Sequence, residues 1–304
     1  MHILIPEAIL PVSLARLREK HTVDYDPNLV KNHAELLKRA TNADAIIVRR
    51  LTQVRGDLLN TMEHCKAVGR LGVGLDNIDV AECEARGIKV IPAPGANARS
   101  VAEYVIATAM MLVRTAYVST EEVIEGLWPK ERLNLGGEIL GRTIGVVGYG
   151  AIGKLTADLA RGLGMNVLVY DPAIGSKETA GCLPVSLAEL LAKSDVVTLH
   201  VPLTPATKDL INVDSIASMK DGAIVINAAR GGIIDEMALL AALRCGKLGG
   251  AAIDAFDNEP LGVCPQYRGI KNLILTPHIA GVTVESEERV NHVVVEAVLK
   301  ALHP

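Results

Sequence analysis

The sequence predicts an α/β protein with two domains, each built on a doubly wound parallel sheet. Short aliphatic strands alternate with helical stretches along most of the 304 residues, a length that accommodates two hydrophobic cores. Pro92 and Pro94 break the first series of elements. A glycine-rich turn then follows a strand that ends near Val147 and begins a second series.

The first series has the short elements of an α/β domain. Its expected strands are Ile3–Ile5, Ala45–Val48, Ala67–Arg70 and Lys89–Ile91, with helices near Ser13–Lys20, Ala34–Arg39 and Val80–Arg86.

A long helix is expected from Arg99 to Val118, with apolar residues on most faces, so it should pack on several sides. A looser arm containing Trp128 follows. The second series of strands comprises Thr143–Val147, Val167–Tyr170, Val196–His200, Ala223–Asn227, Gly250–Asp254 and Leu273–Leu275. A last helix, Val284–Leu302, could by its pattern pack on either domain.

The composition excludes several classes of protein. A net charge of −4 argues against a nucleic-acid partner held through phosphate contacts. No apolar run reaches membrane-spanning length, and the N-terminus lacks the features of a signal peptide. The five scattered cysteines suit a reducing compartment and have no metal-binding spacing. We therefore expect a cytoplasmic protein without a metal site.

The turn from Gly148 to Gly153 has the Gly-x-Gly-x-x-Gly pattern of a dinucleotide site. Gly148 permits a tight turn, Gly150 lets the backbone approach a pyrophosphate, and Gly153 lets the next helix pack close to the sheet. The N-terminus of that helix favours phosphate. Asp171 ends the following strand, where a carboxylate binds ribose hydroxyls and repels a 2′-phosphate, which favours NAD over NADP.

Arg230, Glu259 and His278 each lie just past the carboxyl end of an expected strand, the edge at which open α/β sheets bind ligands. An arginine can hold a substrate carboxylate through two hydrogen bonds. A histidine can exchange a proton at neutral pH, and a carboxylate bonded to it favours the imidazolium form. The trio suits hydride transfer coupled to proton transfer.

Four segments together resemble the D-isomer-specific 2-hydroxyacid dehydrogenases. They are 69–79 (GRLGVGLDNID), 227–236 (NAARGGIIDE), 254–260 (DAFDNEP) and 276–281 (TPHIAG). With the glycine turn they follow the family's order, and the resemblance covers essentially the whole chain.

The resemblance implies two Rossmann-like domains with the active site in the cleft between them. Residues 1–95 plus 284–304 would form the substrate-binding domain and residues 96–283 the NAD-binding domain. The last helix would return to the first domain. Closure of the cleft would exclude water from the hydride path, and a homodimer would form through the NAD-binding domain, with the helix from Arg99 and the Trp128 arm as its surface.

The resemblance also implies a role for each member of the trio. Arg230 would anchor the substrate carboxylate and polarise the C2 oxygen, His278 would be the acid/base, and Glu259 its pairing carboxylate. Asp254 resembles the residue that contacts the nicotinamide carboxamide. The expected cofactor-binding residues are Gly148, Gly150, Ala151, Ile152, Gly153, Asp171, Pro172, His200, Pro202, Thr207, Ala228, Asp254 and Ala280. Many relatives carry a longer polar or basic residue at position 151, so Ala151 puts cofactor affinity in question.

Arg49 and Arg50 follow an expected strand and would suit a substrate with a second anion, such as a phosphate or sulfonate. Arg49 resembles an anion-binding position of phosphoglycerate dehydrogenases, whereas Arg50 could equally be a solvated charge. The backbone N–H groups of Val73 and Gly74 could bind a carboxylate as a small nest, and Asn97 could assist. Arg230 and His278 complete the expected substrate-binding set.

Members of the family that act on 3-phosphoglycerate or sulfolactate look closest to this pattern. Glyoxylate or hydroxypyruvate reduction is an alternative, although those enzymes often prefer NADP, against which Asp171 argues. A nucleotide-sensing corepressor of similar fold is an alternative of another class. The absence of basic segments disfavours it.

Overall fold

The computed structural model describes residues 1–174 and 181–302. The chain divides into two compact units. The first unit comprises Met1–Asn97 and the C-terminal segment from Val282, and the second comprises Ala98–Gly281. These bounds differ by two residues from those expected from the sequence.

Among the described residues, the first unit contains a five-stranded parallel sheet in the order β2-β1-β3-β4-β5, which is the flavodoxin-like order. Its elements are β1 (His2–Ile5), α1 (Pro11–Arg18), β2 (Thr22–Tyr25), α2 (His33–Ala40), β3 (Ala45–Val48), α3 (Gly56–Thr61), β4 (Ala67–Arg70), α4 (Val80–Ala85), β5 (Lys89–Ile91) and α12 (Val284–Leu302).

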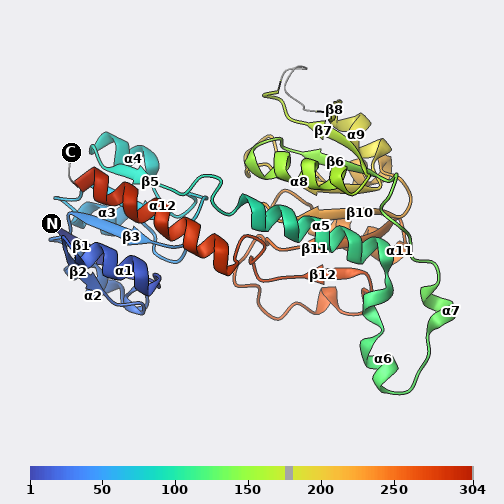
Figure 1. Cartoon of the computed structure of the whole chain (residues 1–304), viewed down its shortest axis with the longest axis horizontal. Coiled ribbons are helices and arrows are strands. Elements are labelled where there is room, and N and C mark those ends of the chain that lie inside the picture. Colours follow the sequence, from blue (N-terminus) through green and yellow to red (C-terminus); the bar gives the residue numbers. More distant parts are fainter. Residues whose placement is uncertain (175–180, 303–304) are drawn as a thin grey trace. The chain divides into compact units, whose positions relative to one another are not determined.

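Alternate residues of these strands face opposite sides of the sheet, and each side is covered by helices. The α1 and α12 helices cover one side, and α2, α3 and α4 cover the other (Figure 1). A Cβ at Gly69 of β4 would lie 2.9 Å from the side chains of both Val294 and Val298 of α12. The last helix therefore belongs to the first unit, and it packs closely against β4 at Gly69, which has no side chain.

The second unit has a seven-stranded parallel sheet within the described residues, in the order β12-β11-β10-β9-β6-β7-β8, the Rossmann order with one added strand. Its strands are β6 (Thr143–Val147), β7 (Asn166–Tyr170), β8 (Leu183–Pro184), β9 (Val196–Leu199), β10 (Ala223–Asn227), β11 (Leu248–Ile253) and β12 (Leu273–Leu275). Its helices are α5 (Ala98–Arg114), α6 (Thr120–Ile124), α7 (Lys130–Leu133), α8 (Ala151–Gly162), α9 (Leu187–Lys193), α10 (Val213–Ser218) and α11 (Glu236–Cys245).

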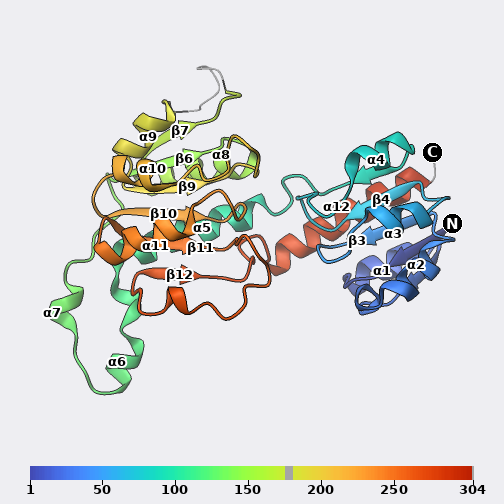
Figure 2. The ribbon, with the colours of Figure 1, turned by 180° about the vertical axis from the view of Figure 1, so that it is seen from behind.

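In this second unit, α5 and α8 cover one side of the sheet, and α9, α10 and α11 cover the other (Figure 2). The strand order reverses between β6 and β9. Ligands of open α/β sheets bind beside the strand ends at such a reversal, and the glycine turn begins there.

The structure corrects the sequence-based elements in a few places. The long helix ends at Arg114 rather than Val118, because Thr115 adopts a left-handed conformation (φ 58°) and a 3₁₀ turn follows. Neither β2 nor α3 was expected from the pattern. Half-exposed residues form β2, and α3 spans only six residues, so both have weak hydrophobic periodicity. Within the described residues, no helix is long and apolar enough to cross a membrane.

Candidate active site

Two glycines of the turn after β6 are required by close backbone contacts. Gly148 has a positive φ of 92°, and its N–H donates to the Tyr170 carbonyl at 2.8 Å. A Cβ at Gly148 would lie 2.5 Å from the His200 carbonyl oxygen. A Cβ at Gly153 would collide with the Gly148 carbonyl oxygen. A side chain at either position would push the turn, α8 and β9 apart.

Gly150 differs from these two, because a Cβ there would meet no atom within 4 Å. The space beside the turn is therefore open, and α8 starts directly afterwards at Ala151 with its first N–H groups toward it. Ile152 follows in the same first turn. This cradle fits a diphosphate, which the helix N-terminus would stabilise.

Asp171 lies at the tip of β7 and organises the turn. Its Oδ2 accepts a hydrogen bond from Tyr149 N–H and its Oδ1 accepts one from Ala173 N–H, both at 2.8 Å. A hollow of about 420 Å³ adjoins Asp171 and is bounded by residues of β7, β8 and the start of α9. Its position and size fit the adenosine half of a dinucleotide. Pro172, the next residue after Asp171, is exposed.

His200 follows β9 and donates its backbone N–H to the Val147 carbonyl at 2.7 Å. Its Nε2 lies 3.1 Å from the Thr198 hydroxyl. Burial lowers the pKa of His200 to about 4, so the ring is neutral at neutral pH. Thr207 has a local role in the following turn, because its hydroxyl donates to the Pro202 carbonyl at 2.6 Å.

Arg230 follows β10 in a turn that Asn227 holds. The Asn227 amide accepts from Ala229 N–H at 3.0 Å and donates to the Arg230 carbonyl at 2.8 Å. The Arg230 Nη1 donates to the Ala229 carbonyl at 2.7 Å. Ala228 is half-buried in the same turn.

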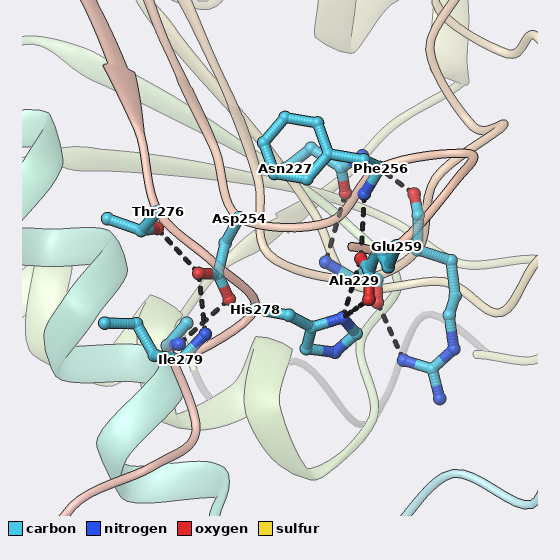
Figure 3. Close-up of polar contacts among 10 residues, drawn as sticks. Asn227, Ala229, Asp254, Phe256, Glu259, Thr276, His278 and Ile279 are labelled. Carbon is cyan, nitrogen blue, oxygen red and sulfur yellow. Dashed lines mark hydrogen bonds and ion pairs between the residues drawn. The ribbon is translucent and has the colours of Figure 1, made fainter. Parts of the chain in front are cut away.

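His278 and Glu259 form a pair, although they come from different loops (Figure 3). The His278 Nδ1 lies 2.9 Å from both carboxylate oxygens of Glu259. Glu259 is fixed in turn, because its Oε1 accepts from Phe256 N–H at 3.0 Å. A carboxylate at this distance stabilises the imidazolium form and holds the ring with Nε2 on the side away from Glu259.

The loop that carries His278 is held by Asp254, a carboxylate with only 1% of its surface exposed. Its Oδ1 accepts from Ile279 N–H at 2.8 Å and from the Thr276 hydroxyl at 2.6 Å, and its Oδ2 accepts from Ala280 N–H at 2.8 Å. His278 between them has a φ of 56°, which costs free energy in a residue with a side chain. These bonds sustain that conformation.

The same loop is connected to α5. The Tyr104 hydroxyl lies 2.7 Å from the Thr276 hydroxyl, and this pair adjoins the Asp254 carboxylate. Burial raises the pKa of Tyr104, so its hydroxyl stays protonated. Neither Tyr104 nor Thr276 was singled out from the sequence, because helical periodicity shows that a residue is buried but not which polar group it meets.

In the first unit, Arg49 follows β3 and is held on three sides. Its N–H donates to Glu7 Oε1 at 2.9 Å, and its carbonyl accepts from the Asn77 amide at 3.1 Å. Its Nη2 pairs with Glu287 Oε1 at 2.6 Å. Arg50 is exposed beside it.

Arg70 ends β4, next to β3, and was missed in the sequence analysis. The same argument from strand ends that singled out Arg49 could have found it. The Arg70 guanidinium lies against Gly72, where a Cβ would collide with it, and its Nη1 donates to the Leu71 carbonyl at 2.9 Å. Asn97, at the end of this part of the unit, has a buried Oδ1 without a hydrogen-bond partner among the described residues.

Comparisons with known proteins identify the family. The model of the D-isomer-specific 2-hydroxyacid dehydrogenase NAD-binding domain matches residues 106–280, more than half of the chain. The chain belongs to this family. The NAD-binding assignment agrees with the cradle at Gly150 and the carboxylate of Asp171, and the protein is an NAD-dependent 2-hydroxyacid dehydrogenase, as the sequence analysis predicted.

Similar members of the family differ in the acids for which they are named. The chain is 46% identical to a (S)-sulfolactate dehydrogenase of Chromohalobacter salexigens, covering 99% of this chain and 98% of the relative. It is 41% identical to a hydroxypyruvate reductase of Thermotoga maritima, covering 88% of each. The solved D-lactate dehydrogenase of Aquifex aeolicus, complexed with NAD and lactic acid, is 29% identical with a TM-score of 0.82, covering 99% of this chain and 95% of that one.

Proposed function

We propose that the protein transfers a hydride between nicotinamide C4 and C2 of a 2-hydroxy or 2-keto acid that carries a second anionic group. The observation that supports the chemistry most directly is the Glu259–His278 pair, whose two residues follow β11 and β12, next to β10, which Arg230 follows. When bound, NADH supplies the hydride. The rest of the reaction, binding the acid and moving one proton, falls to side chains of the protein.

In the proposed mechanism, Arg230 binds the substrate carboxylate and polarises the C2 oxygen. His278 donates a proton from Nε2 to that oxygen during reduction and accepts it during oxidation. Glu259 stabilises the imidazolium and keeps Nε2 directed at the substrate. The half-buried His200 cannot replace His278 as a proton donor, because its lowered pKa leaves the ring uncharged near neutral pH.

We predict that His278→Ala lowers kcat by about 10²–10⁴-fold, because the proton then has no positioned donor. The dissociation constant of NADH, measured by fluorescence titration, should stay within about twofold, since the cradle is untouched. His292→Ala, which removes an exposed histidine of α12, is the control and should change neither value. Unchanged turnover in His278→Ala would remove His278 from the mechanism.

Support for a second anion comes from the edge of the first unit's sheet. Arg49 and Arg50 follow β3, and Arg70 ends the adjacent β4. Among the described residues, the N–H groups of Val73 and Gly74 have no hydrogen-bond acceptor, which suits an anion-binding nest. Sulfolactate, the substrate for which one relative is named, carries a sulfonate besides its carboxylate. We propose sulfolactate and 3-phosphoglycerate, with their keto acids, as the candidate substrates.

A second candidate is a keto acid with a single anionic group, such as hydroxypyruvate. Arg49 is already paired with Glu287, which lowers the positive charge available to a second anion. A relative that is 41% identical is named for hydroxypyruvate reduction. The two candidates differ in how the reaction depends on Arg49.

We predict that Arg49→Ala raises KM for sulfopyruvate or phosphohydroxypyruvate about tenfold or more, the loss of one charge-assisted contact. The KM for hydroxypyruvate should change by less than about threefold, since it offers no second anion. Arg18→Ala, at an exposed arginine of α1, removes the same charge and serves as the control. Initial rates with the three keto acids decide the matter, and an equal rise for all of them would refute the second-anion proposal.

We further propose that two copies of the chain associate through the segment between α5 and β6. Its exposed apolar side chains include Ile124 (73% exposed), Trp128 (79%), Leu135 (87%) and Leu140 (72%). An apolar surface of this extent is typical of a contact with another protein. In a two-fold symmetric dimer, this surface of one subunit would pack against the same surface of the other, so both copies would be covered.

Light scattering of the purified protein should therefore give about twice the chain mass of 32.3 kDa. Replacing both Trp128 and Leu135 by serine should shift the protein toward the monomer without changing its circular dichroism. Replacing Val12, an exposed apolar residue of α1, is the matched control. A monomeric unmodified protein at micromolar concentration would rule out this dimer.

A further inference from the structure

The first turn of α12 places a carboxylate directly against the candidate anion-binding arginine. Glu287 Oε1 lies 2.6 Å from Arg49 Nη2, although 238 residues separate them in the chain. The two side chains are only 21% and 29% exposed. A pair that is mostly shielded from water is screened less by salt than a surface pair, so its charges influence any ion that arrives nearby.

The position of Arg49 does not depend on Glu287. Glu7, which is 5% exposed, binds the N–H groups of Arg49 and Thr52 through Oε1 and that of Leu51 through Oε2. On the other side, the Asn77 amide donates to the carbonyls of Arg49 and Thr52. The backbone that carries Arg49 is thus fixed by groups in the loop after β1 and in the loop before α4.

The contribution of Glu287 is therefore one hydrogen bond to the guanidinium and one negative charge. This charge offsets the positive charge of Arg49. A second anionic group that approaches Arg49 would be attracted by the guanidinium and repelled by Glu287. Small inorganic anions such as sulfate would be repelled by the Glu287 carboxylate in the same way.

We propose that Glu287 is a specificity-determining residue, whose carboxylate occupies Arg49 and weakens binding of a second anion relative to binding of a substrate with one. This inference rests on the proposed function of the arginines at this edge. Glu287 acts as an internal competitor for Arg49. It limits the preference for dianionic over monoanionic keto acids and reduces occupation of Arg49 by sulfate or phosphate.

The opposite role for Glu287 would be to orient the guanidinium for the substrate, and the two roles predict opposite results. The substitution Glu287→Gln separates them, because the amide oxygen still accepts a hydrogen bond from Arg49 while the negative charge is lost. If Glu287 competes for Arg49, the uncharged glutamine binds the guanidinium less well, and the affinity of the protein for a second anion rises. If Glu287 instead orients the guanidinium, the substitution leaves the affinity for a second anion unchanged or lowers it.

The experiment compares Glu287→Gln with Glu288→Gln, the adjacent exposed residue, which changes the net charge equally. For Glu287→Gln, KM for sulfopyruvate and phosphohydroxypyruvate should fall about three- to tenfold, the effect of removing one opposing charge. The KM for hydroxypyruvate should stay within about twofold, and the inhibition constant of inorganic sulfate should fall with the dianion KM values. Unchanged or higher KM values for the dianions would overturn the proposal.

Two further measurements keep this inference distinct from the proposed function. In Arg49→Ala, adding Glu287→Gln should raise the sulfate affinity by a smaller factor than it does when Arg49 is present, because only the repulsion by Glu287 is then relieved, and an equal factor would refute the competition. If no dianionic keto acid is reduced by the unmodified protein, the proposed function fails. Thermal shift with inorganic sulfate then still tests Glu287, because Glu287→Gln should be stabilised at lower sulfate concentrations than Glu288→Gln. If the two variants reached half of their maximal stabilisation at the same sulfate concentration, the inference would be overturned.

Discussion

The geometry of the candidate active site depends on one buried carboxylate, Asp254, at the end of β11. It binds the backbone on the C-terminal side of His278 and the Thr276 hydroxyl on the other side. Between these contacts His278 adopts a left-handed backbone conformation. A loop without such contacts would relax to a more favourable conformation. Because the loop is fixed in this way, the imidazole reaches Glu259, which is itself fixed by Phe256 N–H. In the proposed mechanism, proton transfer by His278 therefore depends on Asp254, a residue outside the proposed catalytic trio.

Carboxylates organise the first unit as well, and their partners determine what each one does. The Glu7 carboxylate accepts hydrogen bonds from three backbone N–H groups and fixes the loop after β3, so its role is to stabilise local structure. Glu287 meets a guanidinium and alters the charge that a ligand would encounter. Asp171 at the glycine turn combines both effects, since it binds two N–H groups and still presents a negative charge where a ribose would lie.

The sequence was sufficient for the features that depend on local pattern. The β3 and β4 strands were placed at their observed bounds, as was α12, because strand ends and helical periodicity are encoded locally. Gly153 was expected to permit close packing of α8, and its contact with Gly148 agrees. The family was confirmed by the match to residues 106–280, because its motifs occur in order along the chain.

Other features depend on residues that are distant in sequence and could not be read from it. The pair of Arg49 with Glu287 joins a strand end to the last helix. The contact of Tyr104 with Thr276 links α5 to the His278 loop. In both cases the sequence shows a polar residue near an apolar pattern, but only the packing of the two elements selects its partner.

The central claim is that Glu259 holds the Nδ1 side of His278 and leaves Nε2 for the substrate. Nitrogen-15 NMR of labelled protein at low temperature tests it through the proton on the His278 Nδ1. The account predicts a strongly deshielded signal for the proton on that nitrogen, and this signal should move upfield in Glu259→Gln, where an uncharged amide oxygen replaces the carboxylate, while the backbone spectrum stays that of the folded protein. A signal that is unchanged by Glu259→Gln, or a proton found instead on Nε2 alone, would contradict it.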